Sequence, residues 1–276
     1  MKILVIGGNG MAGHILVRYF REQKNVALFY TCRDITDEHA LLLDVTDTEQ
    51  VERIITAVRP HVIINAVGVL NEAAAQRPIE AYQVNGLLPH RLRQIADRLG
   101  ARVVHISTDC VFSGHKGQYR EDDKPDGTSI YAVTKKLGEL TAEEPHLTVR
   151  TSIIGPEIRP QGIGLLHWFL RQEGTIQGYR QVWWNGVTTW ELARAIHHYL
   201  QRGISGLIHL GHPQPIHKHE LLTLFKNVFS KVNVDIASTD EPVLNRTLAN
   251  TRTDADYTLP SYPDMIAELA ERMHWR

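Results

Sequence analysis

The chain has 276 residues, enough for one large α/β domain or for a large domain with a smaller one. Its 30 Lys and Arg residues balance 31 Asp and Glu residues, which leaves a formal net charge of -1. This balance argues against a nucleic-acid-binding surface and against electrostatic attachment to anionic membranes. The 15 histidines are spread along the chain without the spacing of a metal site, so no metal is expected.

Two cysteines, Cys32 and Cys110, are too few for a disulfide framework. The opening residues MKILVIGG indicate a β-strand rather than a signal peptide, and no apolar run is long enough to span a bilayer. We therefore expect a cytoplasmic protein that keeps its thiols reduced and does not enter a membrane.

Strand-like and helix-like segments alternate through the first half, which is typical of a parallel sheet covered by helices on both faces. The expected strands are nearly continuous apolar runs, as strands buried on both faces should be. They cover residues 2–6, 26–31, 62–67, 102–107 and 147–154. The helices expected between them cover residues 14–22, 47–58, 79–99 and 130–143.

Beyond about Gly155, Gly, Pro, Trp and His become frequent, and helical stretches alternate with loops. Helices are expected at residues 165–172, 189–201, 220–232 and 261–274, and a strand at residues 206–210. We predict a Rossmann-like doubly wound parallel sheet in residues 1–154, to which residues of about 186–211 return. Residues 155–276 are then expected to form mainly a smaller, substrate-binding lobe.

A glycine-rich turn follows the first expected strand and opens the first helix. Gly7, Gly10 and Gly13 have the spacing G-x-x-G-x-x-G. Glycines permit a tight turn and let the backbone approach a pyrophosphate, which then lies at the helix N-terminus. A tight turn that binds nothing is the simpler alternative, but the place of the motif after an N-terminal strand favours a dinucleotide site.

The end of the second expected strand indicates which dinucleotide binds. An acidic residue there would bond the ribose hydroxyls of NAD and repel a 2′-phosphate. Here Arg33 can pair with a 2′-phosphate and Thr31 can add a hydroxyl. Asp34 follows directly, and a solvated surface arginine is the alternative. We expect NADP(H), and NAD(H) stays open.

Asp44 and Val45 follow three consecutive leucines, which suits the end of a further strand. There the Asp44 carboxylate can accept a hydrogen bond from the adenine amine of the dinucleotide. Equally, it can cap the helix expected near residue 47. Both interpretations stay open.

Tyr131 and Lys135 are four residues apart, which places the phenol and the ammonium on one face of the expected helix 130–143. Of the nine tyrosines, only Tyr131 has a lysine at this offset. A nearby positive charge lowers a tyrosine pKa from about 10. Tyr131 is therefore expected to donate a proton to a carbonyl oxygen while Lys135 holds the nicotinamide ribose. An ordinary surface helix is the alternative for this spacing alone.

The expected strand 102–107 is apolar until its carboxyl end, where the sequence becomes polar. Ligands collect at this edge of an open parallel sheet. Thr108 is placed to hydrogen-bond a substrate carbonyl, and Ser107 is its neighbouring alternative. A strand-end turn with no role in binding would also explain these hydroxyls.

Seven motifs occur in the order in which one enzyme family carries them. They are GGNGMAG, INAVG, AYQVN, HISTDCVFSG, YREDDKP, YAVTKKLGE and RTSIIGPE. The chain resembles the extended short-chain dehydrogenase/reductases, and within them the dTDP-4-dehydrorhamnose reductase-like group. The resemblance covers the first half closely and continues more loosely through WNGVTTWELARAI and GLIHLG.

The resemblance implies NADPH-dependent reduction of the 4-keto group of a nucleotide-linked 6-deoxyhexose, in deoxysugar or polysaccharide biosynthesis. It implies Thr108, Tyr131 and Lys135 as the catalytic residues. The implied cofactor-lining positions, together with Arg33 and Val45, are Gly7, Gly10, Met11, Asp44, Ala66, Val67, Gly68 and Asn85. The implied substrate-binding positions are Asp109, Cys110, Ser152 and Arg246. Relatives often dimerise through the helices that correspond to residues 79–99 and 130–143, so a homodimer is the expectation.

Two positions depart from the group and keep alternatives open. Cys110 stands where the group usually has Tyr, and Arg246 is followed by Thr247 where the group often has Pro. A bifunctional epimerase–reductase would use Cys110 with a histidine, for which His167 is the candidate. A non-catalytic, NADP-binding regulatory subunit is a second alternative. A UDP-galactose-type epimerase is a third, but it would hold NAD rather than NADP.

Overall fold

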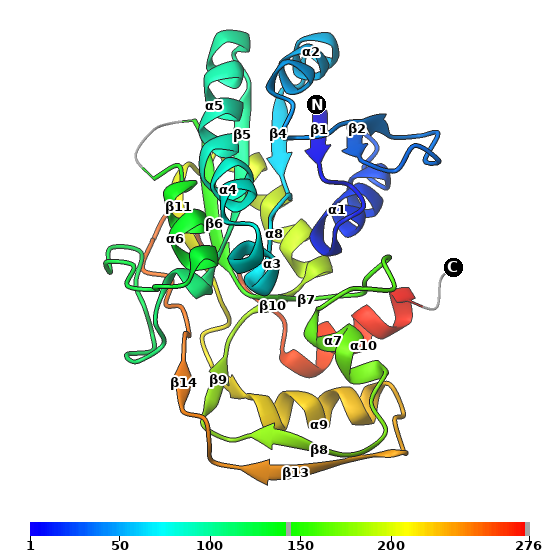
Figure 1. Cartoon of the computed structure of the whole chain (residues 1–276), viewed down its shortest axis with the longest axis vertical. Helices are drawn as coiled ribbons and strands as arrows, with labels where there is room; N and C mark the ends of the chain where they lie inside the picture. Colours follow the sequence, from blue (N-terminus) through cyan, green and yellow to red (C-terminus); the bar gives the residue numbers. More distant parts are fainter. Residues whose placement is uncertain (142–144, 274–276) are drawn as a thin grey trace.

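A seven-stranded parallel sheet forms the centre of the computed structural model, which describes residues 1–141 and 145–273 (Figure 1). The strand order is β11-β6-β5-β4-β1-β2-β3. The strands are β1 (Lys2–Ile6), β2 (Ala27–Cys32), β3 (Leu41–Leu42), β4 (Val62–Asn65), β5 (Arg102–Thr108), β6 (Leu147–Thr151) and β11 (Gly206–Leu210). The order reverses between β1 and β4, and ligands bind at such a switch point. The predicted Rossmann-like fold is confirmed.

Helices cover both faces of this sheet. They are α1 (Met11–Arg21) and α8 (Thr189–Gln201) on one face, and α2 (Thr48–Val58) and α5 (Leu88–Leu99) on the other. Ile3 and Val5 of β1 belong to the core beneath α1 and α8. Leu4 and Ile6 belong to the core beneath α2 and α5. Successive residues of a strand point to opposite faces, so a continuous apolar strand is buried on both sides.

Much of the remaining chain forms a lobe below the sheet in Figure 1. Its longest strand pair joins β8 (Gly174–Tyr179) to β13 (Val234–Thr239) in parallel. The shorter strands are β7 (Ile153–Ile154), β9 (Val182–Trp184), β10 (Val187–Thr188), β12 (Ile216–His217) and β14 (Leu244–Asn245). The helices are α7 (Leu165–Leu170), α9 (Lys218–Val228) and α10 (Tyr262–Met273). Between this lobe's segments, α8 and β11 return to the large sheet.

The expected helix 79–99 is wrong in detail. The chain instead forms α3 (Asn71–Gln76), α4 (Pro78–Ala81), the π-helical turn η1 (Tyr82–Leu87) and then α5. Asn85 lies in the π-helical turn and is fully buried. Its side-chain amide hydrogen-bonds to the backbone of Val69, outside the helix. π-Helical turns often mark functional positions.

Other boundaries differ from the expected ones as well. The expected strand 147–154 divides into β6 and β7, and α6 (Ile130–Leu137) ends before residue 143. Gly138 follows α6 at a close approach, because a Cβ there would lie 2.0 Å from Asn85 O. Residues 142–143 of the expected helix 130–143 and residue 274 of the expected helix 261–274 lie outside the described residues. Within the described ranges, no helix is both long and apolar enough to cross a membrane.

We expect Gly13→Ala to lower the free energy of unfolding by about 1–3 kcal/mol, because backbone atoms must move to admit the methyl group. A Cβ at Gly13 would lie 1.9 Å from Gly7 O. Gly10→Ala is the matched control, since its Cβ would meet Gly7 O at an ordinary 3.4 Å. Urea unfolding of the two variants measures the difference. Equal losses would contradict the close-approach explanation.

Candidate active site

The glycine turn joins β1 to α1 and shapes the bottom of the site. Gly7 has φ +89°, which favours glycine, and Gly13 packs directly on Gly7 O. The Gly7 amide donates to Thr31 Oγ1 (3.3 Å), which ties the turn to the end of β2. Gly10 caps α1 without a side-chain acceptor for the first amides. Those amides are therefore available to an anion such as a pyrophosphate.

A first cleft, here called the cofactor cleft, runs past this turn at the carboxyl ends of β1, β2 and β4. It gathers predicted residues from four separate segments of the sequence. They are Gly7, Gly10, Thr31, Arg33, Asp44, Val45, Ala66, Val67 and Gly68. The groove is thus polar at the β2 end and apolar beside β4, which suits a dinucleotide.

Asp44 lines this cleft and does not cap a helix. Its Oδ1 accepts from Thr46 N (3.0 Å) and Thr46 Oγ1 (2.8 Å). The cap of α2 is Asp47, whose Oδ1 accepts from Glu49 N and Gln50 N. The helix-cap interpretation of Asp44 is therefore wrong, and its contact with adenine stays a prediction.

Asn85 lies behind the wall of the groove rather than on it. Its Oδ1 accepts from Val69 N (2.8 Å), and its Nδ2 donates to Val69 O (2.8 Å) and Thr134 Oγ1 (3.1 Å). It is fully buried and lines neither cleft in the described part of the chain. The structure therefore does not support direct contact between Asn85 and a cofactor. Instead, the Asn85 amide links the segment after β4 to α6.

A second cleft, here called the catalytic cleft, opens beside the first. It contains the predicted Met11, Thr108, Asp109, Cys110, Tyr131, Lys135 and Ser152. The two clefts share Asn9, Gly10, Ala66, Val67, Gly68 and Arg159. They therefore form one groove that leads from the β2 end to the three predicted catalytic residues.

The choice between Thr108 and Ser107 is decided by their hydrogen bonds. Ser107 Oγ donates to the buried Glu139 Oε1 (2.7 Å). Thr108 Oγ1 accepts from Cys110 N (3.1 Å) and donates to Asp109 Oδ1 (3.1 Å) at the edge of the catalytic cleft. Ser107 is thus engaged by a buried carboxylate, and the contact of Thr108 with a substrate carbonyl stays a prediction.

Tyr131 and Lys135 share the cleft, but their electrostatics differ from the prediction. Burial raises the pKa of Tyr131 well above its ordinary value. The charges of Cys110 and Asp109 raise this pKa further, and a hydrogen bond with Thr108 lowers it in part. Lys135 is not among the groups that shift it, and the Lys135 Nζ donates to Ile106 O (2.6 Å). Burial lowers the pKa of Lys135 itself to about 8. The expected lowering of the tyrosine pKa by this lysine is therefore wrong for the protein alone.

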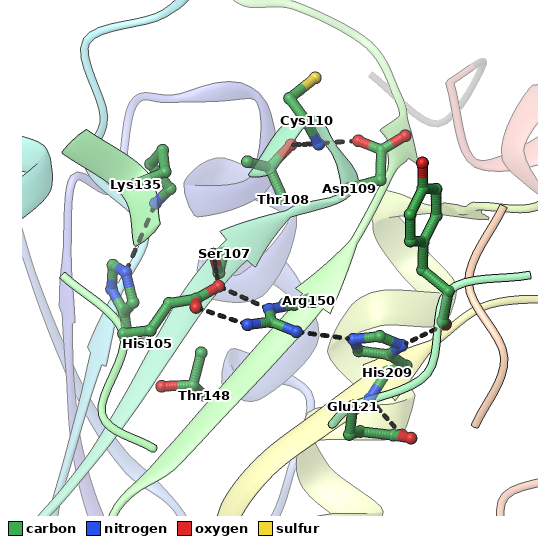
Figure 2. A network of polar contacts seen from close by, with 12 residues as sticks. His105, Ser107, Thr108, Asp109, Cys110, Glu121, Lys135, Thr148, Arg150 and His209 are labelled. Atoms are coloured by element: carbon green, nitrogen blue, oxygen red, sulfur yellow. Dashed lines mark hydrogen bonds and ion pairs between the residues drawn. The ribbon is translucent and has the colours of Figure 1, made fainter. Parts of the chain in front are cut away.

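Next to Ser107 of β5, Arg150 and Glu139 form a buried ion pair that links β5 and β6 to the end of α6 (Figure 2). Arg150 of β6 donates from Nε to Glu139 Oε1 (2.7 Å) and from a terminal nitrogen to Oε2 (2.8 Å). Its other terminal nitrogen meets His209 Nε2 (3.1 Å), and His209 Nδ1 faces Tyr119 O (2.9 Å). A guanidinium cannot accept, so His209 must be neutral with its proton on Nδ1.

Of the expected substrate-binding residues, Arg246 and Ser152 differ in their places relative to the cleft. Arg246 donates from Nε to Phe112 O (2.9 Å) and from a terminal nitrogen to Cys110 Sγ (3.7 Å). It therefore holds the 3₁₀ turn η2 (Asp109–Val111) and does not line either cleft in the described chain. Ser152, in contrast, does line the catalytic cleft, and its Oγ accepts from Trp184 Nε1 (2.9 Å).

The structure does not bring His167 to Cys110. His167 Nε2 bonds Pro160 O (3.2 Å), outside the walls that the described residues form around the catalytic cleft. Burial raises the pKa of the Cys110 thiol to about 12, with Asp109 adding. A thiol with so high a pKa is a poor base at neutral pH. The cysteine–histidine pair required for the epimerase–reductase alternative is not formed.

Sequence reasoning missed Arg159 and Lys218. Arg159 lines both clefts. The Lys218 ammonium lies 5.6 Å from the Trp184 ring centroid, and burial lowers its pKa to about 8 while Asp109 and Cys110 oppose. Both cations reach the site from the C-terminal half, and no spacing in the sequence links them to it.

We expect the protein to lose stability as the pH falls below about 6.5, partly because of His209. Burial lowers the pKa of His209. The Glu121 charge raises this pKa in part, and the Arg150 charge lowers it further. Since the folded pKa is below the unfolded value, the neutral ring stabilises the fold above about pH 6.5, and this contribution is lost as pH falls. His209→Gln should flatten the dependence measured by urea unfolding between about pH 7 and 5. The same change at exposed His115 is the control, and an unaltered slope in His209→Gln would contradict the assignment.

Comparisons with known proteins agree with this geometry. The chain is 30% identical over 155 residues to the spore coat polysaccharide biosynthesis protein SpsK of Bacillus subtilis (strain 168), covering 55% of this chain and 51% of that protein. It is 29% identical over 150 residues to methionine adenosyltransferase 2 subunit beta of Bos taurus, covering 53% and 44%. The chain thus spans about half the length of the curated relatives it matches.

Two solved structures match nearly the whole chain. A hypothetical dTDP-4-dehydrorhamnose reductase from Sulfolobus tokodaii has a TM-score of 0.77 at 27% identity, covering 90% of this chain and 92% of that chain. The dTDP-4-dehydrorhamnose reductase of Bacillus anthracis str. Ames, in complex with NADP, has a TM-score of 0.81 at 19% identity, covering 98% and 99%. The second likeness shows the fold alone.

A family model also matches the sequence. The RmlD substrate binding domain family matches residues 1–242, which is most of the chain. This match confirms the resemblance to dTDP-4-dehydrorhamnose reductase-like extended short-chain dehydrogenase/reductases that the motifs indicated. The chain belongs to the RmlD substrate binding domain family.

Proposed function

We propose that this protein reduces the 4-keto group of a nucleotide-linked 6-deoxyhexose with NADPH, in cytoplasmic deoxysugar biosynthesis. The observation that carries the proposal is the shared cleft: Thr108, Tyr131 and Lys135 line a groove that continues into the cofactor cleft. Membership of the RmlD substrate binding domain family supports the substrate class. Two free cysteines are compatible with a reducing compartment.

Tyr131 is suited to act as the general acid. NADPH supplies the hydride that reaches the keto carbon, and the carbonyl oxygen then needs one proton. Burial raises the Tyr131 pKa, so the phenol holds its proton until the oxygen becomes basic. The product is an alcohol, and Tyr131 is left as a phenolate that must be reprotonated before the next turnover.

Thr108 and Lys135 place the reacting groups. Thr108 Oγ1 can turn its proton from Asp109 to the substrate oxygen without leaving the Cys110 amide that fixes it. The Lys135 ammonium donates one N–H to Ile106 O, and its Nζ lies 3.5 Å from His105 Nε2, which can take a second N–H. Its third N–H is available for a ribose hydroxyl. His105 is in turn joined to Asn65 Nδ2 through Nδ1 (3.1 Å), which limits the movement of the ammonium.

In this proposal NADPH follows the cofactor cleft. The amides at the start of α1 would hold its pyrophosphate, and Arg33 and Asp44 would hold its adenosine end. NADH is expected to bind more weakly because it lacks the 2′-phosphate that Arg33 can pair with. Ser152, at the far side of the nicotinamide end, then begins the sugar pocket.

A non-catalytic cofactor-binding subunit is the second candidate. The observation that favours it is the 29% identity to methionine adenosyltransferase 2 subunit beta over 150 residues. The convergence of Thr108, Tyr131 and Lys135 favours catalysis instead. Binding of NADPH without its oxidation by any keto sugar nucleotide would support the subunit.

The substrate is tested by following NADPH oxidation with 4-keto-6-deoxyhexoses carried on dTDP, GDP, UDP and CDP. Each is compared with NADH in place of NADPH. Reduction of at least one of these sugars, faster with NADPH, is expected. If NADPH binds but none of the sugars is reduced, the proposed activity is wrong.

We expect Tyr131→Phe to lower kcat by roughly two to four orders of magnitude, because the phenolic proton is removed while the ring remains. The affinity for NADPH, measured by fluorescence titration, should change little. Tyr179→Phe in β8 is the matched control and should keep wild-type turnover. Near-normal turnover in Tyr131→Phe would remove this residue from the acid role.

We also propose a homodimer. Exposed apolar side chains lie on α4, η1 and α6, with Ile79 76%, Leu87 57% and Leu137 46% exposed. A second copy of the same surface would bury them. Leu87→Glu is then expected to convert a dimer to a monomer in size-exclusion chromatography. A wild-type protein that elutes as a monomer at high concentration would contradict the dimer.

A further inference from the structure

Arg159 reaches the cofactor cleft from outside the dinucleotide-binding half. Every other described residue that lines this cleft lies between Gly7 and Val84. Arg159 belongs to the segment between β7 and α7, and Gly164 at the end of that segment packs against Met11 at the start of α1. The segment therefore passes over the glycine turn and carries a guanidinium to the far wall of the groove.

The charge of Arg159 shifts the pKa values of two residues at the end of β2. Hydrogen bonds from Thr36 hold the pKa of Asp34 below its usual value, and the Arg159 charge acts in the same direction. At Cys32, where burial raises the thiol pKa, Arg159 opposes the rise. These two residues flank Arg33, so two guanidinium groups lie near the same strand end, one from each half of the chain.

The carboxylate at this strand end is not directed to a ribose. Asp34 Oδ1 accepts from Thr36 N (2.9 Å) and Thr36 Oγ1 (2.7 Å), so the acid is held within its own turn. An acid that bonds the ribose 2′-hydroxyl is the feature that selects NAD. Among the described residues that line the cleft, the cations are Arg33 and Arg159.

We propose that Arg159 is a specificity-determining residue that binds the 2′-phosphate of NADP(H) together with Arg33. The inference rests on the proposed use of NADPH. A phosphate monoester carries between one and two negative charges near neutral pH, and a planar guanidinium can donate two parallel hydrogen bonds to it. Arg33 comes from the wall at the end of β2 and Arg159 from the segment that crosses the groove. NADH offers neither side chain an anion at that place.

The test is equilibrium binding of NADPH and NADH, followed by nicotinamide fluorescence, to the wild-type protein and to Arg159→Gln. We expect Arg159→Gln to weaken NADPH binding by about tenfold or more and NADH binding by less than about twofold, since one charge-assisted contact is lost. Arg98→Gln, at an exposed ion pair with Glu52 between α5 and α2, is the charge-matched control and should behave as wild type. Thermal melting without cofactor verifies that each variant is folded.

A second background separates phosphate binding from simple neutralisation of Asp34. If Arg159 only offsets that carboxylate, Arg159→Gln should have no effect on NADPH affinity once Asp34→Asn is present. If Arg159 binds the phosphate, the loss of about tenfold should persist in the Asp34→Asn protein. Persistence supports the proposal, and disappearance overturns it.

Three other outcomes would overturn the assignment. Equal weakening of NADH and NADPH in Arg159→Gln would place the arginine at the shared pyrophosphate. Unchanged affinity for both would leave Arg159 without a role while the proposed reductase activity stands. A wild-type protein that binds neither nucleotide would remove both the proposed function and this inference.

Discussion

The buried carboxylate of Glu139 is the contact on which the catalytic geometry depends. It follows α6, the helix that carries Tyr131 and Lys135, and it accepts from Ser107 of β5 and from two nitrogens of Arg150 of β6. Both members of the ion pair are almost completely buried. Removing one partner of such a pair leaves an uncompensated charge, which disfavours any arrangement that separates them. The helix is thereby held in one position over the strand that ends in Thr108.

This arrangement also assigns separate roles to neighbouring polar residues. Ser107 and Thr108 both line the catalytic cleft, but their hydroxyls have different partners. Ser107 donates to the buried Glu139, whereas Thr108 bonds to Asp109 and Cys110. The surrounding burial raises the pKa values of Tyr131 and Cys110, which keeps the phenol and the thiol protonated. The site is therefore prepared to give a proton rather than to take one.

The C-terminal half contributes more charge to the site than its sequence indicated. Arg246 holds η2, Lys218 lies by Trp184 near Asp109, and Arg159 crosses the cofactor cleft. Arg246 was expected to bind substrate, because it falls where the family group often has an Arg-Pro substrate motif. Its donors are instead directed at Phe112 O and Cys110 Sγ. A motif identifies the residue type at a position, but the packing around the guanidinium decides which acceptor it meets.

The sequence by itself determined the features that depend on near neighbours. The glycine spacing in residues 7–13, the Tyr131–Lys135 offset and the apolar strands reflect backbone sterics and the periods of helix and strand, so they could be predicted. The π-helical turn at Asn85, the neutral His209 beside Arg150, the separation of His167 from Cys110 and the reach of Arg159 could not. Each of these is decided by contacts between residues distant in the chain. Only the folded chain brings those partners within hydrogen-bonding or Coulombic range, and burial then sets the strength of their interaction.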